Sequence, residues 1–143
     1  NLSIPDAETL GQALRALFSH LAEDGYVSVQ AYLDRTALPQ AAELRDQIAR
    51  VTGRPTTFGW APRFLHSTGQ YHKGGPAQGV YLQIVSAAKQ DIAVPGREFT
   101  FAELIASQAA GDAKVLAEHG RPVLTLTLTD AKAGIEAIKR ILA

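Results

Sequence analysis

Hydrophobic positions along this chain switch several times between a helical and a strand-like period. Near the start, leucines recur at helical spacing and predict a first helix that ends at Gly25: Leu10, Leu14, Leu17 and Leu21. Ser3, with Asp6 three residues later, is the candidate N-cap of this helix. The stretch YVSVQAYL, residues 26–33, then alternates apolar and polar side chains, which predicts a first strand.

A second helix and two further strands follow in the pattern. The stretch LPQAAELRDQIARVTG has Pro39 in its first turn, apolar residues along one face and Gly53 at its end, which predicts a helix. The β-branched and aromatic TTFGW, residues 56–60, predicts a strand that Pro62 ends. The stretch GVYLQIVSA, residues 79–87, is apolar almost throughout, so we expect a central parallel strand buried on both faces.

The remaining third of the chain repeats the alternation of elements. AKQDIAVPGREF, residues 88–99, has turn residues and no period, and predicts a loop. Thr100 and Glu103 form a predicted capping box for a helix through about Glu118, which Gly120 closes. PVLTLTLT predicts a last strand, and Asp130 is the candidate cap of a C-terminal helix.

Strands separated by helices predict the fold class. Parallel strands need crossover connections, so this order of elements indicates an α/β fold, a three-layer α/β/α sandwich with a mostly parallel sheet. The length of 143 residues fits a single domain, which we assign to residues 1–143.

The amino-acid composition argues against nucleic acids and membranes as partners of this protein. Fourteen basic residues balance fourteen acidic ones, so no long-range positive field favours binding to nucleic acid or to an anionic membrane. The sequence has no apolar run near the roughly 18 residues of a membrane helix and no signal-peptide pattern at its start. Because cysteine is absent, a disulfide framework and a thiolate metal site are excluded, and the cytoplasm is the expected compartment.

Hydrogen-bonding side chains gather between the second and third predicted strands. His66 follows the end of a predicted strand, where an imidazole can exchange protons with a ligand or, alternatively, cap nearby backbone. Ser67 lies beside it, but the surrounding residues lack the Gly-x-Ser-x-Gly elbow, so we discount a hydrolase.

Other candidate sites have weaker sequence patterns. Two histidines, His66 and His72, are too few ligands for a metal site, and the sequence has no His-Glu-x-x-His pattern. The other two histidines, His20 and His119, lie in predicted helices, so we expect neither a metal nor a cofactor. Lys73 with the two glycines that follow resembles a phosphate-cradling loop only loosely, and a plain Gly-Gly-Pro turn accounts for it equally well. Lys139 alone would be assigned to a solvated helix face.

Two segments together resemble one enzyme family. LHSTGQYHKGGPAQGVYLQI resembles the histidine-bearing segment of glucose-6-phosphate isomerases, most closely the form in bifunctional transaldolase/isomerase fusions, and GIEAIKRIL resembles the lysine-bearing C-terminal helix of that family. AVPGREFTFAELIASQAAGD is also similar to the fusion-type enzymes, so the resemblance covers most of residues 26–143. It implies a Rossmann-like sugar-isomerase (SIS) domain that forms the C-terminal half of a larger isomerase. The absence of methionine and the start at Asn1 agree with a missing upstream segment.

The resemblance also implies roles for individual residues in converting glucose 6-phosphate to fructose 6-phosphate. His66 would open the sugar ring, and Lys139 would either stabilise the developing negative charge of the enediolate or fix the open-chain sugar. Four residues are expected to bind the sugar phosphate: Ser67, Gln70, Lys73 and Lys132, the last standing where many members have glutamine. The family's carboxylate base lies upstream in a Glu-Ser-x-Gly-Lys-like stretch that this chain lacks, and Glu43 has none of its flanking residues.

Three functions remain open at this point. The leading hypothesis is an isomerase half-domain that is inactive alone and is completed by an upstream SIS domain and, where the histidine crosses between subunits, by a homodimer. The alternative is a non-catalytic, regulatory SIS module that binds sugar phosphate. The third is a domain that serves only dimerisation.

Overall fold

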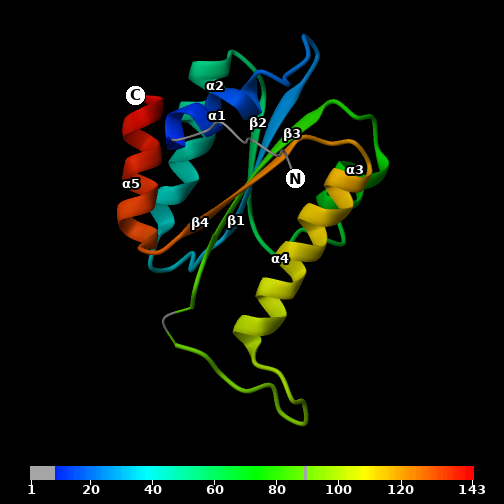
Figure 1. The fold of residues 1–143 in the computed structure, drawn as a ribbon, viewed down its shortest axis with the longest axis vertical. Helices are drawn as coiled ribbons and strands as arrows, with labels where there is room; N and C mark the ends of the chain where they lie inside the picture. Colours follow the sequence, from blue (N-terminus) through cyan, green and yellow to red (C-terminus); the bar gives the residue numbers. More distant parts are fainter. Residues whose placement is uncertain (1–8, 89) are drawn as a thin grey trace.

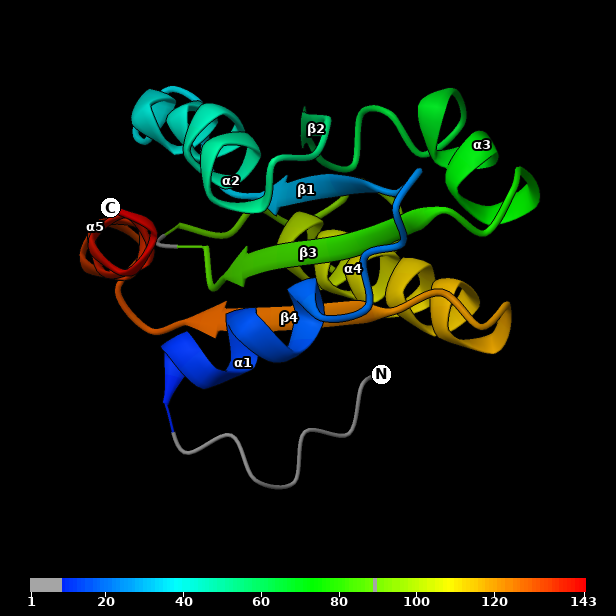
Figure 2. The same ribbon diagram turned by 90° about the horizontal axis from the view of Figure 1, so that it is seen from above.

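The computed structural model describes residues 9–88 and 90–143, which form one parallel sheet flanked by helices (Figure 1). The strands are β1 (Tyr26–Tyr32), β2 (Thr56–Trp60), β3 (Gly79–Ser86) and β4 (Val123–Leu128). Their order across the sheet is β2-β1-β3-β4, and each neighbouring pair is parallel (Figure 2). The predicted α/β class and the central position of the third strand are both confirmed.

Helices cover both faces of this sheet. The helices are α1 (Leu10–Phe18), α2 (Leu44–Thr52), α3 (Thr68–Gly74), α4 (Phe101–Glu118) and α5 (Ala131–Leu142), with a 3₁₀ turn, η1 (Pro39–Glu43), leading into α2. Helices α1, α2 and α5 lie on one side of the sheet, and α3 and α4 lie on the other (Figure 1). This arrangement is the predicted three-layer sandwich. In the described part of the chain, no helix is long and apolar enough to cross a membrane.

Local capping residues set both ends of α4 and the start of α5 where the sequence predicts them. Thr100 and Glu103 form the predicted capping box of α4, and the Asp130 carboxylate accepts a hydrogen bond from the Ala133 amide at the start of α5. Gly120 follows α4 with a φ of 69°, a left-handed conformation that glycine adopts without strain. These boundaries therefore follow from local sequence.

The first helix differs in length from the prediction. It begins after Thr9, which forms a capping box with Gln12, and ends at Phe18, well before Gly25. The candidate cap Ser3 and its partner Asp6 lie outside the described residues. His20, predicted in the helix, lies in the turn that follows.

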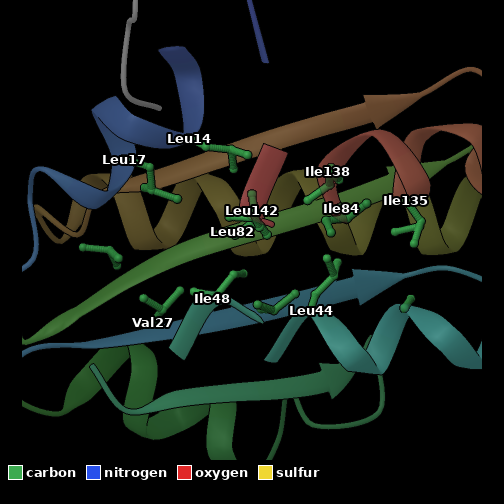
Figure 3. Packing of buried hydrophobic residues seen from close by; sticks show 13 residues of the cluster. Leu14, Leu17, Val27, Leu44, Ile48, Leu82, Ile84, Ile135, Ile138 and Leu142 are labelled. Carbon is green, nitrogen blue, oxygen red and sulfur yellow. The ribbon is translucent and has the colours of Figure 1, made fainter. Parts of the chain in front are cut away.

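The main apolar core fills the space between the sheet and helices α1, α2 and α5 (Figure 3). Alternate residues of β1 and β3 point into it, and each helix contributes leucine or isoleucine side chains. The fully buried members with the largest side chains are Leu14, Leu17, Leu44, Ile48, Leu82, Ile84, Ile135 and Ile138. At about 25 cal/mol per Å² of buried apolar surface, this layer is the principal source of folding stability.

The segment between β2 and β3 contains a helix that the sequence pattern does not predict. Residues 61–67 form turns and then enter α3, a short helix that the glycine-rich sequence does not predict. Gly69 lies so close to the chain before it that an added Cβ would stand 3.1 Å from the Phe64 carbonyl oxygen, and His72 is 4% exposed. Packing against the rest of the protein, rather than helix propensity, therefore forms α3.

A polar pocket between α3 and α4

Buried polar side chains gather on the α3–α4 side of the sheet. Ser28 and Gln30 alternate along β1 with the core residues Val27 and Val29, so they face away from the apolar core. Gln83 on β3 donates a hydrogen bond to the Ala109 carbonyl of α4 at 3.0 Å. In the described part of the chain the buried polar and charged residues are Ser28, Gln30, His72, Gln83, Asp112 and Arg121. All belong to this side of the sheet.

A pocket of about 250 Å³ lies where the α3 segment meets α4. From the α3 side it is lined by Leu65, His66, Gln70 and Lys73, and from α4 by Gln108, Gly111, Asp112 and Val115. Three of the residues that sequence analysis assigned to the site, His66, Gln70 and Lys73, are thus brought together.

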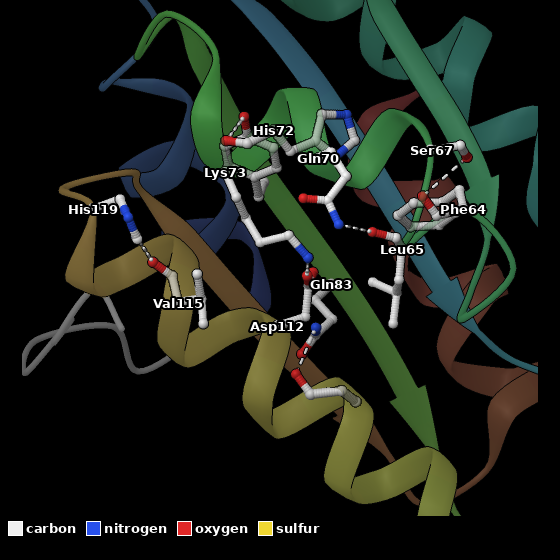
Figure 4. Close-up of polar contacts among 12 residues, drawn as sticks. Phe64, Leu65, Ser67, Gln70, His72, Lys73, Gln83, Asp112, Val115 and His119 are labelled. Carbon is white, nitrogen blue, oxygen red and sulfur yellow. Dashed lines mark hydrogen bonds and ion pairs between the residues drawn. The ribbon is translucent and has the colours of Figure 1, made fainter.

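The Lys73 ammonium is held by a carboxylate on the opposite wall of this pocket. Its Nζ lies 2.9 Å from Asp112 Oδ1, with the lysine side chain 21% exposed and the aspartate side chain 3% exposed (Figure 4). The attraction is strong because Asp112 is largely removed from water. Lys73 is therefore part of a partly buried ion pair rather than of the phosphate-cradling turn considered from the sequence.

Asp112 is a site residue that was not predicted from the sequence, although its position on α4 carries a signal. The buried residues of α4 recur at helical spacing, as Ala109, Asp112, Ala113 and Leu116. A carboxylate on this otherwise apolar stripe needs a buried partner, which is Lys73. A charged residue at a core position of a predicted helix is thus the feature that would have pointed to this site.

On the same side of the sheet as the pocket, several buried polar atoms have no hydrogen-bond partner among the described residues. They include Asp112 Oδ2, the Tyr32 hydroxyl and both side-chain polar atoms of Gln30. Burial, followed by the nearby Asp112 charge, raises the pKa of the Tyr32 hydroxyl well above its usual range, so this group stays protonated. Buried groups of this kind are normally satisfied by water or by a ligand.

The remaining predicted residues on this segment contact backbone. Ser67 precedes α3, and its hydroxyl donates a hydrogen bond to the Phe64 carbonyl at 3.1 Å (Figure 4). The Gln70 amide makes a long contact of 3.4 Å to the Leu65 carbonyl. Ser67 therefore stabilises the turn, whereas the exposed Gln70 side chain also reaches the pocket.

The second histidine of the segment is a packing residue. His72 lies among the rings of Tyr26, Phe64 and Tyr81, with ring centroids 5.2 Å from Tyr81 and 6.0 Å from Phe64. Burial lowers the pKa of His72 below its ordinary value, so the neutral imidazole is favoured. Within residues 9–88 and 90–143 no three His, Asp or Glu side chains are arranged to hold a metal ion.

Lys139 and Lys132 lie on α5, on the other side of the sheet from the pocket. The Lys139 Nζ is 2.8 Å from Glu43 Oε2 and 3.5 Å from Glu136 Oε1. The hydrogen bond to Glu43 raises the pKa of Lys139, which keeps the amine charged. Lys132 is exposed in the first turn of α5. Within one chain, His66 and Lys139 therefore belong to elements on opposite faces of the sheet.

Comparisons with known proteins bear on the fold. No family model matches the sequence, and no curated protein matches it. Among solved structures, a hypothetical protein from Thermus thermophilus superposes with a TM-score of 0.70 at 21% sequence identity, over 92% of this chain and 36% of that one. The chain thus spans little more than a third of the length of this neighbour. The similarity supports the Rossmann-like three-layer α/β architecture.

Proposed function

We propose that this chain is the C-terminal domain of a cytoplasmic aldose–ketose isomerase that interconverts glucose 6-phosphate and fructose 6-phosphate. The observation that carries the proposal is the pocket between α3 and α4, where His66, Gln70 and Lys73 meet. These residues come from the segment that resembles the histidine-bearing part of glucose-6-phosphate isomerases. The substrate is a sugar phosphate, and the partner is an upstream SIS domain of the same enzyme.

The exposed position of His66 at the pocket suits proton transfer. Opening a sugar ring requires a proton to move between the anomeric hydroxyl and the ring oxygen, and an imidazole beside the sugar can accept and return it. Isomerisation through a cis-enediolate then needs a base at the carbon next to the carbonyl. Asp112, the carboxylate that lines the pocket, is already bonded to Lys73, so we assign the base to the upstream domain.

The separation of His66 from Lys139 has a direct consequence for the proposed enzyme. Because the two residues lie on elements covering opposite faces of the sheet, one copy of the chain does not supply both to one substrate. A complete site then takes His66 from one subunit and Lys139 from another, as expected for a closed homodimer. Lys139 must also exchange its contact with Glu43 for the developing oxyanion.

Turnover of fructose 6-phosphate by the full-length gene product tests this proposal. His66→Ala and Lys139→Ala are each expected to lower kcat by about 10²-fold or more, because each removes a group acting in the transition state. His119→Ala is the matched control: this exposed histidine ends α4 and its ring contacts the Val115 carbonyl at 2.8 Å. A folded wild-type enzyme without turnover, or a His66 variant as active as the control, contradicts the proposal.

Mixing the two inactive variants tests the shared site. Random exchange of subunits between His66→Ala and Lys139→Ala dimers makes half of the dimers mixed, each with one intact site of two. Activity should therefore recover to about a quarter of wild type. Recovery is absent if both residues act within one subunit, which would contradict the shared site but leave the isomerase activity itself supported.

A second candidate, the regulatory sugar-phosphate-binding module, is favoured by one feature. The carboxylate in the pocket is committed to an ion pair with Lys73, so the residues that line the pocket offer no free carboxylate to act as the enolising base. This candidate predicts saturable binding of fructose 6-phosphate by the full-length protein without turnover. The isomerase predicts both.

A further inference from the structure

We propose that the Lys73–Asp112 pair forms a subsite for the hydroxyl groups of a neutral polyol, and that this pocket does not bind phosphate. The inference deepens the proposed isomerase function, on which it rests, because it states which part of a sugar phosphate enters the pocket. It assigns a binding role to Asp112, which the sequence analysis did not consider.

The charge of the pocket argues against phosphate. Its cationic lysine is compensated at 2.9 Å by the nearly buried Asp112 carboxylate. A phosphate dianion placed at the Lys73 ammonium would also face the negative charge of the Asp112 carboxylate at short range, which opposes its binding. A site that grips phosphate instead offers uncompensated cations or a helix N-terminus rich in free amides.

The hydrogen-bonding groups of the pocket suit hydroxyls. A lysine ammonium carries three N–H donors, and Lys73 uses one of them on Asp112. Gln70 and Gln108, which line the pocket, each offer an amide donor and an amide acceptor. A hydroxyl group both donates and accepts, so adjacent hydroxyls on one carbon chain match this mixture.

The remaining walls fit the carbon skeleton of such a ligand. Leu65 and Val115 supply apolar surface from the two sides of the pocket. Its volume of about 250 Å³ is at the small end for ligand sites, which favours a single small molecule over a chain of sugar units. The hydroxyl-bearing carbons then lie beside His66, and the phosphate is left to the upstream domain.

Amide chemical shifts of the isotopically labelled protein test the inference with two probes, D-glucitol and inorganic phosphate. In the wild type, D-glucitol should give saturable shifts confined to residues 65–73 and 108–115, and phosphate should give none there. Phosphate that shifts these amides and displaces D-glucitol would overturn the inference. So would D-glucitol that gives no saturable shift.

Substitution of Asp112 should weaken the binding of D-glucitol and allow phosphate to bind. Asp112→Asn leaves the Lys73 charge uncompensated, so D-glucitol affinity should fall by about tenfold and phosphate should begin to bind. Lys114→Met, which removes an exposed lysine of the same helix, should change neither. Should Asp112→Asn fail to fold, Gln108→Ala serves instead and should weaken D-glucitol binding without creating phosphate binding. Unchanged D-glucitol affinity in the folded variant would contradict the assigned role.

The outcomes separate this inference from the proposed function. Binding of D-glucitol at the pocket with no isomerase turnover by the full-length protein rejects the isomerase and keeps the subsite. Isomerase turnover that depends on His66, combined with phosphate binding in the pocket, keeps the isomerase and rejects the subsite.

Discussion

The two faces of the sheet differ in what they bury. On the α1, α2 and α5 side, β1 and β3 contribute Val27, Val29, Leu82 and Ile84 to an apolar core. On the α3–α4 side, the same two strands present buried glutamines, and α4 adds the Asp112 carboxylate. One pair of strands thus serves an apolar layer and a polar one, because alternate residues point to opposite faces.

This difference between the two faces indicates which face contributes most to stability and which is expected to bind a ligand. Burying apolar side chains stabilises the fold, whereas burying polar atoms without partners costs free energy. Proteins retain costly groups of this kind mainly at functional sites. The orphaned atoms of Gln30, Tyr32 and Asp112 therefore support placing the ligand on the α3–α4 side.

The largest effect on stability is expected in the apolar layer. Leu82→Ala should lower the free energy of unfolding by about 3 kcal/mol, because the fully buried side chain leaves a cavity between β3 and the helices. Urea unfolding, monitored by circular dichroism, measures this change in the free energy of unfolding. Ile92→Ala, at a residue 68% exposed, is the control and should change the value by less than about 0.5 kcal/mol. Equal losses of unfolding free energy in Leu82→Ala and Ile92→Ala would contradict the assignment of Leu82 to the apolar core.

A somewhat smaller loss is expected on the polar side from breaking one half of the ion pair. Lys73→Met should cost about 2 kcal/mol, since it leaves the Asp112 carboxylate buried without its partner, although the partial exposure of Lys73 moderates the loss. The double variant Lys73→Met with Asp112→Asn should recover part of this loss in the same unfolding measurement. No recovery would mean that the cost lies in packing rather than in the unpaired charge.

Helix caps should contribute equally on the two sides. Thr100→Ala removes the cap of α4 on the polar side, and Asp130→Ala removes the cap of α5 on the apolar side. Each should lower the free energy of unfolding by about 1 kcal/mol, because the lost oxygen leaves a helix amide unpaired. Thermal unfolding of the two variants side by side checks this. A clear inequality would mean that tertiary packing, rather than the cap itself, sets the loss.

The smallest effect should come from the pH dependence of the polar side. Burial lowers the pKa of His72 in the folded state. The negative charge of Asp112 raises this pKa and so opposes the effect of burial, whereas the positive charge of Lys73 lowers it further. The contribution of His72 to stability is therefore complete above the unfolded pKa of about 6.5 and is lost as pH falls from there toward the folded pKa, with a slope below about 1.4 kcal/mol per pH unit.

Comparison with His72→Phe isolates this contribution, because phenylalanine keeps a ring among the neighbouring aromatic side chains and does not titrate. Urea unfolding at a series of pH values below 7 should show the wild type losing stability relative to the variant as pH falls. Parallel pH profiles for the two proteins would contradict the assignment.

The sequence predicts the elements on the apolar side of the sheet better than those on the α3–α4 side. Periodicity and caps locate α2, α4, α5 and the strands, since these signals are local: Thr100 with Glu103, and Asp130, act within a few residues. Helix α3 is not predictable in this way, because contacts with residues distant in the chain, such as Tyr26 beside His72, stabilise it.

The candidate site shows the same division. His66, Gln70 and Lys73 are close in sequence, so one local segment brings them together at the pocket. The partner of Lys73 lies 39 residues away on another helix, and the separation of His66 from Lys139 depends on which face each element covers. Neither relation is encoded in local spacing.

The most direct test of the account is to locate fructose 6-phosphate on the labelled full-length protein by amide chemical shifts. The account predicts saturable shifts at residues 65–73 and at residues 108–115, on the two walls of the α3–α4 pocket, and weaker binding at both walls in Gln108→Ala. Saturable binding that leaves both walls unshifted would contradict the placement of the sugar at this pocket.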